Sequence, residues 1–206
     1  MAPKRQTLLT ATLCSSFGLL LVSPLWAWDG IVEKQTFEMD SFTTHGGETI
    51  PNVTVGWEAY GELNDARDNV ILITHFFSGT SHAAGRYEED GQPTGYWDAI
   101  IGSGKPLDTD EYYIISSDTL VNLNAKDPNV TTTGPASINP DTGEPWGMDF
   151  PVVTIRDFVE VQRELLESQG IESLHAVMGA SMGALASASA SASASASVSA
   201  LNGAST

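Results

Sequence analysis

The chain has 206 residues, of which 41% are hydrophobic, and its 9 Lys and Arg stand against 26 Asp and Glu, giving a formal net charge of −17. This length and hydrophobic content suit one globular domain with a real core. The acidic excess repels phosphate backbones and anionic membranes, so the composition argues against a nucleic-acid partner.

The N-terminal residues have the pattern of a secretory signal peptide. Lys4 and Arg5 precede an apolar run that ends at Ala27, and no acidic residue appears before Asp29. We expect residues 1–27 to be cleaved off and the protein to be periplasmic or secreted, without stable membrane insertion. The alternative is an uncleaved anchor, because residues 7–25 are nearly long enough to span a bilayer. An intact mass of the exported protein that still includes residues 1–27 would contradict cleavage.

The sequence predicts no metal and no cofactor. The only cysteine, Cys14, lies inside the predicted signal peptide. Cleavage would remove it and, by removing two basic residues, take the charge from −17 to −19. The four histidines, His45, His75, His82 and His175, lack the spacing of metal ligands.

Strand-like segments dominate the first part of the domain, residues 28–185. Residues 30–39 and 50–63 are expected to form strands around the turn "THGGE", where Gly46 and Gly47 allow a tight reversal. The runs "NVILITH" and "EYYIISSD" are typical of strands buried on both faces of a parallel sheet. Between them the sequence predicts loop, with a short helix near residues 97–101.

The second part of the domain alternates between loop, helix and strand. Residues 119–149 are rich in Asn, Pro, Gly and Thr and predict a long irregular segment. An amphipathic helix is expected over residues 154–171, with a capping box of Thr154 and Asp157 and a stop at Gly170. "SLHAVM" then predicts a third buried strand, and the strand–helix–strand order predicts a parallel α/β sheet.

Residues 186–206 form a separate low-complexity tail of nearly alternating Ala and Ser. They have no large side chains to bury in a further layer, so we expect disorder or loose helix. The abrupt change in composition suggests that the reading frame is lost near residues 184–187. Translation of the DNA in the other two frames should then reveal a continuing helix, a lid, and a late Asp and His, and the hypothesis fails if neither frame does.

A candidate nucleophile lies directly after the third predicted strand. The residues Gly179-Ala180-Ser181-Met182-Gly183 match G-x-S-x-G, and a small-residue helix start follows them. This context is typical of a nucleophile elbow, in which a strained turn projects the serine Oγ above the sheet. The alternative is a plain small-residue turn between a strand and a helix.

The segment "THFFSG" follows the first buried strand, where such folds place an oxyanion donor. We expect the backbone N–H groups of Phe77 and Met182 to form the oxyanion hole. Alternatively, Phe76 and Phe77 are core aromatics at a strand end. We expect His75 to shape this loop and His175, within its strand, to be a core residue.

Four segments together resemble the homoserine O-acetyltransferase family, a branch of the α/β-hydrolase fold. They are "NVILITHFFSGTSHAAG", "GYWDAIIGSGKPLDTDEYYIISSD", "LHAVMGASMG" and residues 132–171, of which residues 134–157 are the most specific part. The resemblance spans residues 49–184 and implies an incomplete α/β-hydrolase that lacks the lid and C-terminal strands. The signal peptide and "VNLNAKDPNVTTTGP" depart from the family pattern and suggest an exported esterase-like relative.

The resemblance implies ping-pong acyl transfer, in which Ser181 takes an acyl group from a small-molecule donor and passes it to an alcohol or to water. Its oxyanion donors fall on Phe77 and Met182. Because the acid and the histidine of this fold follow the serine, and no Asp, Glu or His follows Ser181, we expect this chain to be catalytically incomplete. The alternative is a non-catalytic secreted α/β remnant or binding module. The acyl donor and the oligomeric state stay open.

Overall fold

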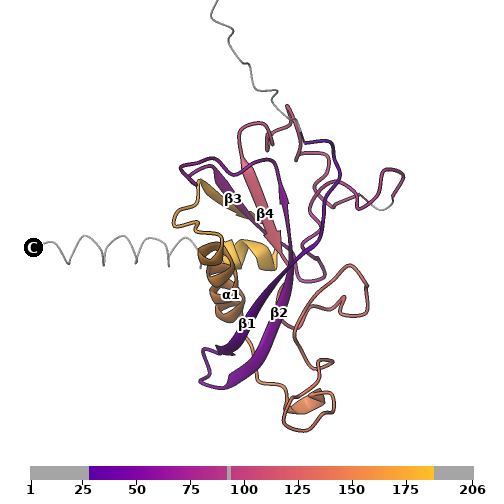
Figure 1. The fold of residues 1–206 in the computed structure, drawn as a ribbon, viewed down its shortest axis with the longest axis vertical. Helices are drawn as coiled ribbons and strands as arrows, with labels where there is room; N and C mark the ends of the chain where they lie inside the picture. The colour runs from indigo at the N-terminus through magenta and orange to yellow at the C-terminus, as the bar shows by residue number, and fades with distance from the viewer. Residues whose placement is uncertain (1–27, 92–93, 188–206) are drawn as a thin grey trace, which may run out of the picture.

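The computed structural model describes residues 28–91 and 94–187 and contains one mixed sheet of five strands. The predicted signal peptide and nearly all of the predicted Ala–Ser tail lie outside the described residues. The sheet order is β1-β2-β4-β3-β5. The strands are β1 Gln35–Thr43, β2 Thr49–Tyr60, β3 Val70–Thr74, β4 Tyr113–Ser117 and β5 Ala176–Gly179 (Figure 1).

The sheet combines an antiparallel hairpin with a parallel core. β1 and β2 pair antiparallel, as do β2 and β4, whereas β3 pairs in parallel with both β4 and β5. The predicted turn between β1 and β2 is present, and of its two glycines only Gly47, with φ +90°, adopts the left-handed conformation. The parallel arrangement brings the C-terminal ends of β4, β3 and β5 to the same edge of the sheet, where α/β proteins place their sites.

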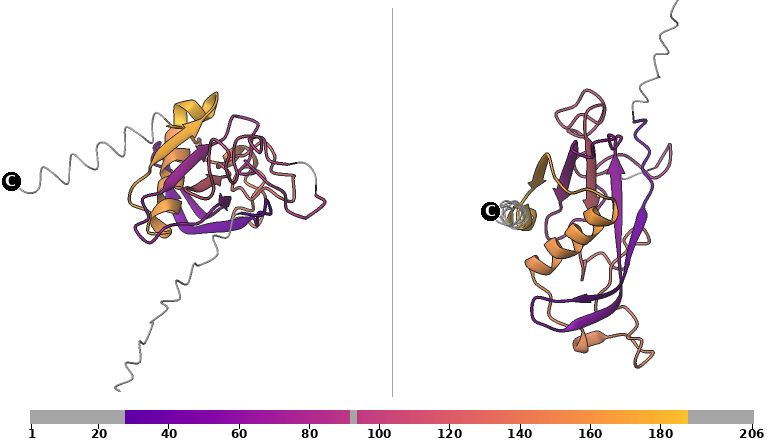
Figure 2. Two further views of the ribbon diagram at one scale, coloured as in Figure 1. Left: turned by 90° about the horizontal axis from the view of Figure 1, so that it is seen from above. Right: turned by 60° about the vertical axis from the view of Figure 1, so that its left-hand side comes forward.

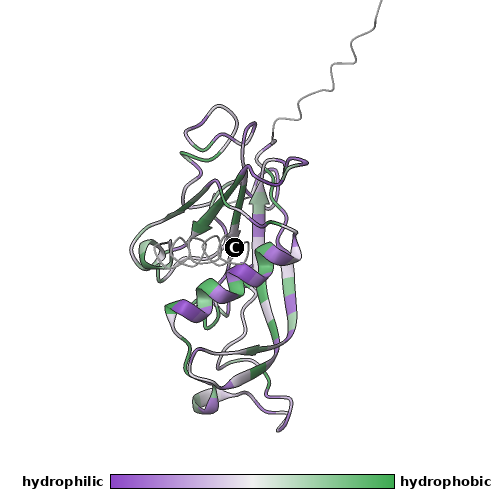
Figure 3. Ribbon diagram, turned by 90° about the vertical axis from the view of Figure 1, so that its left-hand side faces the viewer, coloured by the Kyte–Doolittle hydropathy of each residue, from purple (hydrophilic) through white to green (hydrophobic). Residues whose placement is uncertain are grey.

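Side chains from β3 and β4 pack on both faces of the sheet. On one face Leu72 and Ile115 contact Leu165 of helix α1 (Ile155–Ser168). On the other face Ile73 and Ile114 belong to a cluster with residues of the 83–107 loops. Figure 2 shows α1 and these loops on opposite sides of the strands, and Figure 3 shows hydrophobic residues concentrated in the parallel part of the sheet. The prediction that these two strands are buried on both faces is therefore confirmed.

Two predicted features differ in the structure. Residues 97–100 form a hydrogen-bonded turn and not a helix, because the backbone returns at once to pair Ile101 with Leu107. β5 is only partly buried, with Met178 36% exposed, because among the described strands β3 alone lies beside it. Residues 119–149 are irregular as predicted, apart from one 3-10 turn, Gly147–Asp149. No helix in the described ranges combines the length and the apolar character of a membrane span.

Helix α1 begins as the capping-box pattern predicts. Asp157 Oδ2 accepts hydrogen bonds from Thr154 N at 2.6 Å and from Thr154 Oγ1 at 2.7 Å, and Asp157 Oδ1 accepts one from His45 N at 2.6 Å. Burial would raise the pKa of Asp157, but these hydrogen bonds outweigh it and lower the pKa. The carboxylate thus joins the β1–β2 turn to the start of α1.

Replacing Asp157 by alanine should therefore lower the free energy of unfolding by about 1–3 kcal/mol, because it removes the charged acceptor of the partly buried Thr154 and His45 N–H groups. Urea denaturation at neutral pH measures the effect. Glu160→Gln is the control on the same helix. Since Glu160 only pairs with the exposed Arg163, it should cost less than about 0.5 kcal/mol. Equal costs for the two variants would contradict this role of Asp157.

Candidate active site

Ser181 lies in a strained turn between β5 and a short helical segment, residues 182–187. It is exposed and has φ +57°, a conformation that residues with a Cβ rarely adopt. Such strain costs on the order of 1–3 kcal/mol and persists only where the surrounding structure enforces it. The hydroxyl therefore sits at the N-terminal end of a helical segment and at the C-terminal edge of the sheet, where a nucleophile elbow places it.

The glycines on either side of Ser181 lie where no larger residue fits. A Cβ on Gly183 would lie 2.0 Å from the carbonyl oxygen of Thr74 and 2.9 Å from that of His75. A Cβ on Gly179 would lie 2.2 Å from Thr74 Oγ1 and 2.6 Å from the carbonyl carbon of Gly183. The helical segment after Ser181 thus rests directly on the end of β3, and its glycines are needed for this close contact.

Thr74 connects the turn to the sheet, a role that the sequence did not reveal. Its Oγ1 is buried at the end of β3 and lies 2.8 Å from the carbonyl oxygen of Gly183 and 2.9 Å from Ser187 Oγ. The available signal was a lone hydroxyl residue at the end of an otherwise apolar strand. These contacts hold the helical segment in place beneath Ser181.

The predicted oxyanion segment directly follows β3. Phe77 is 64% exposed, so it is not a core aromatic, whereas Phe76 packs edge-on against Tyr96 at 5.1 Å between ring centroids. Within the described ranges, neither the Phe77 nor the Met182 backbone N–H donates a hydrogen bond. Because Gly183, the residue after Met182, has no space for a Cβ beside the carbonyl oxygens of Thr74 and His75, the two chain segments that carry these N–H groups lie side by side.

The histidines are placed differently from one another. His75 is buried beside the oxyanion segment, its Nδ1 lies 2.7 Å from the carbonyl oxygen of Phe76, and burial lowers its pKa. His175 was expected in the core, which is wrong. It precedes β5 at the open side of the sheet and is exposed, with its ring tilted against Tyr112. His82 is bound to the buried carboxylate of Glu58.

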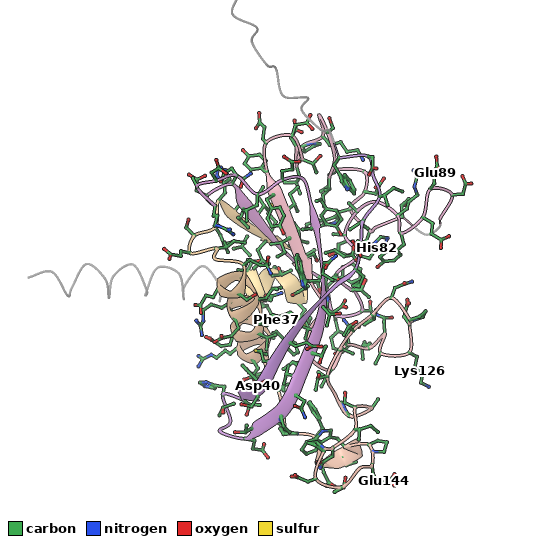
Figure 4. The ribbon with its side chains drawn as sticks, in the orientation of Figure 1. Phe37, Asp40, His82, Glu89, Lys126 and Glu144 are labelled. Atoms are coloured by element: carbon green, nitrogen blue, oxygen red, sulfur yellow. The ribbon has the colours of Figure 1, made fainter. Side chains whose placement is uncertain are left out.

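That carboxylate belongs to a buried charge cluster that the sequence did not reveal. Lys34 Nζ lies 2.8 Å from Glu58 Oε1 and 3.5 Å from Asp118 Oδ2, and both carboxylates are completely buried. Burial would raise the pKa of Glu58, but hydrogen bonds from His82, Lys34 and Tyr87 and the charge of Lys34 lower it to about 2. Figure 4 shows His82 beside β2. Among the described residues no group of His, Cys, Asp and Glu could hold a metal ion.

Comparison with known proteins shows that the chain is similar in sequence to homoserine O-acetyltransferases. It is 44% identical over 152 residues to homoserine O-acetyltransferase of Carboxydothermus hydrogenoformans, which is 74% of this chain and 38% of that protein. It is 46% identical over 154 residues to the enzyme of the same name from Deferribacter desulfuricans, covering 39% of that protein. No family model matches the chain.

Solved structures give the same result. Esterase E22 superposes with a TM-score of 0.75 at 68% identity, and homoserine O-acetyltransferase from Bacillus anthracis with 0.74 at 50% identity. Each likeness covers 76% of this chain and 42% of the other chain. The expected fold is thereby confirmed as an incomplete α/β-hydrolase, and the chain spans less than half the length of these relatives.

Proposed function

The chain is, in part, a homoserine O-acetyltransferase-like α/β-hydrolase, and from this premise we propose that Ser181 is the nucleophile of an acyl-transfer or ester-hydrolysis reaction. One observation carries the proposal: Ser181 has φ +57° between two glycines that have no space for a Cβ. That backbone strain has no other evident purpose than to expose the Oγ at the edge of the sheet.

The geometry supports a two-step mechanism. Ser181 Oγ attacks the carbonyl carbon of an ester or thioester, and the negative charge that develops on the carbonyl oxygen is stabilised by the N–H groups of Phe77 and Met182. The alcohol or thiol leaves as the C–O or C–S bond breaks, and an acyl-enzyme remains. Water or a second alcohol then attacks the acyl carbon and releases Ser181. Whether the acceptor is water or an alcohol distinguishes an esterase from an acyltransferase.

The reaction also needs a general base that takes the proton from the Ser181 hydroxyl, and these 206 residues offer no evident one. Residues 182–206 contain no Asp, Glu or His, although this fold takes its acid and histidine from after the serine. Upstream, His75 Nδ1 is bound to the Phe76 carbonyl oxygen and His82 Nδ1 to Glu58. His75 Nε2 is buried without a hydrogen-bond partner among the described residues, so it makes no bond to Ser181 Oγ. A missing general base costs about 10²–10⁴-fold in rate. We therefore propose that the 206-residue chain carries the nucleophile and oxyanion groups without an efficient base.

This proposal predicts how the chain responds to an external base. Without added base, the 206-residue protein and its Ser181→Ala variant should hydrolyse p-nitrophenyl acetate at indistinguishable rates. Added imidazole should accelerate hydrolysis more in the parent protein than in Ser181→Ala, because a free imidazole can take the Ser181 proton. The difference between the two proteins at equal imidazole concentration is the measurement.

Two outcomes would contradict it. A clear Ser181-dependent rate without imidazole would show that an upstream group such as His82 serves as base. Equal rates at every imidazole concentration would favour the alternative, a non-catalytic α/β binding module.

We also propose that the protein is exported, which is supported by Lys4, Arg5 and the apolar run that follows them. The intact mass of the exported protein tests that point.

A further inference from the structure

A loop of nine residues, 75–83, carries the Phe77 N–H from the end of β3 across the sheet edge. We call it the oxyanion loop. It contains no helix or strand, so its own backbone supplies little rigidity. An oxyanion hole works because its donors are held in place before the reaction begins. The position of this loop must therefore be fixed by groups outside it.

The buried charge cluster supplies such groups. Asp118 Oδ1 accepts a hydrogen bond from Ser81 N at 2.7 Å, and Glu58 Oε2 lies 3.0 Å from His82 Nδ1. Lys34 Nζ donates to Ser81 Oγ and binds both carboxylates. The two carboxylates and the lysine thus contact consecutive residues at the C-terminal end of the oxyanion loop.

Two uncharged side chains, those of Tyr60 and Asn122, also bind the oxyanion loop. The Tyr60 hydroxyl donates to Glu58 Oε2 at 2.9 Å and accepts from Ala83 N at 2.8 Å. The buried Asn122 Nδ2 donates to the carbonyl oxygen of Gly79 at 3.0 Å. The contacts of Ala83 and Gly79 join the loop to β2 and to the segment after β4, and the Tyr60 hydroxyl links Ala83 to Glu58. The loop is therefore bound to the sheet by side chains along its whole second half.

The free-energy cost of burying these charges indicates that the cluster has a role besides stabilising the fold. Removing two carboxylates and an ammonium from water is costly, and well-packed apolar residues of similar volume often stabilise a core as well or better. Charged hydrogen bonds do, however, fix direction and distance more closely than apolar contacts do. Here every charged member either contacts the oxyanion loop or holds a group that does.

We propose that Glu58, together with Lys34 and Asp118, positions the oxyanion loop so that the Phe77 N–H meets the oxyanion formed at Ser181. This inference rests on the proposed function of Ser181. Glu58 is a positioning residue: it does not touch the substrate and acts through Ser81, His82 and Tyr60.

Amide hydrogen exchange of the 206-residue protein tests the proposal by local opening rather than by overall stability. In Glu58→Gln the amides of Ser81 and Ala83 should exchange at least about tenfold faster, because loop opening now breaks fewer charged contacts. The amides of Thr44 and Gly47, bonded within the β1–β2 turn, open independently and should keep their rates. Glu38→Gln, at an exposed carboxylate on β1, is the matched control and should change none of the four.

The outcomes separate this proposal from the proposed function. Unchanged exchange at Ser81 and Ala83 in Glu58→Gln, with faster exchange only in β3 and β4, would overturn the positioning role. If Glu58→Gln does not fold, Tyr87→Phe removes the 2.7 Å hydrogen bond to Glu58 Oε1 and should accelerate the same two amides, more weakly. A fluorophosphonate should modify Ser181 about tenfold more slowly in Glu58→Gln than in the parent. If Ser181 reacts in neither protein, the proposed function fails while the exchange result still decides the position of the loop.

Discussion

The Gly183→Ala variant should lose about 3 kcal/mol of unfolding free energy or fail to fold, because its new methyl group would overlap with neighbouring backbone atoms. The new Cβ would lie 2.0 Å from the Thr74 carbonyl oxygen and 2.9 Å from that of His75. Both are backbone atoms at the end of β3, which is paired on both sides, so neither can move without disturbing the sheet. Urea denaturation followed by circular dichroism measures the loss.

Gly46→Ala provides the matched control for this substitution. A Cβ at position 46 meets only Thr44 Oγ1, at 3.5 Å, which is ordinary contact. That variant should stay within about 0.5 kcal/mol of the parent. If Gly183→Ala is as stable as Gly46→Ala, the helical segment after Ser181 does not rest on β3 and the described turn is wrong.

The Glu58→Gln variant should be about 3 kcal/mol less stable than the parent at pH 7, and this difference should vanish near pH 2. The folded protein lowers the pKa of Glu58 from 4.5 to about 2, so the charged form favours folding. A lowered pKa contributes its full stability above about pH 4.5 and loses it as the pH falls to about 2. Once protonated, the glutamic acid resembles glutamine in shape and charge.

Unfolding free energies of both proteins from pH 7 to pH 2 give this difference directly. Glu38→Gln should run parallel to the parent throughout, since its carboxylate is exposed. A difference between Glu58→Gln and the parent that stays constant with pH would mean that lost packing, and not lost charge, accounts for the cost. The effect on the oxyanion loop is a separate matter that hydrogen exchange resolves.

Short sequence patterns predicted most of the fold, because the hydrophobicity of a buried strand and the capping of a helix depend on residues that are close together in the chain. The nearly continuous apolar runs predicted β3 and β4, since a strand buried on both faces carries apolar side chains at most positions. The pair Thr154 and Asp157 marked the start of α1, and the structure contains that capping contact. The turn at residues 97–100 was mistaken for a helix because its apolar residues fill the core from a loop.

The parts of the candidate site that depend on neighbouring residues could be predicted from the sequence, whereas those that depend on residues far apart in the chain could not. The position of Ser181 in a turn after β5 followed from neighbouring glycines, which the sequence shows directly. The buried cluster did not, because Lys34, Glu58 and Asp118 are far apart in the chain and each looks like an ordinary surface charge. His175 was misplaced because its strand was taken as buried on both sides, whereas among the described strands β5 has one neighbour.

Covalent labelling tests the central claim that Ser181 is a nucleophile held in a formed elbow. The 206-residue protein is incubated with excess fluorophosphonate, digested, and examined by peptide mass spectrometry, with Ser181→Ala in parallel. We expect slow modification at Ser181 and none in the variant, since the strained turn and the proposed oxyanion donors would favour attack even without an efficient base. Labelling of Ser187 or other serines to the same extent as Ser181, or no labelling at all, would contradict the claim.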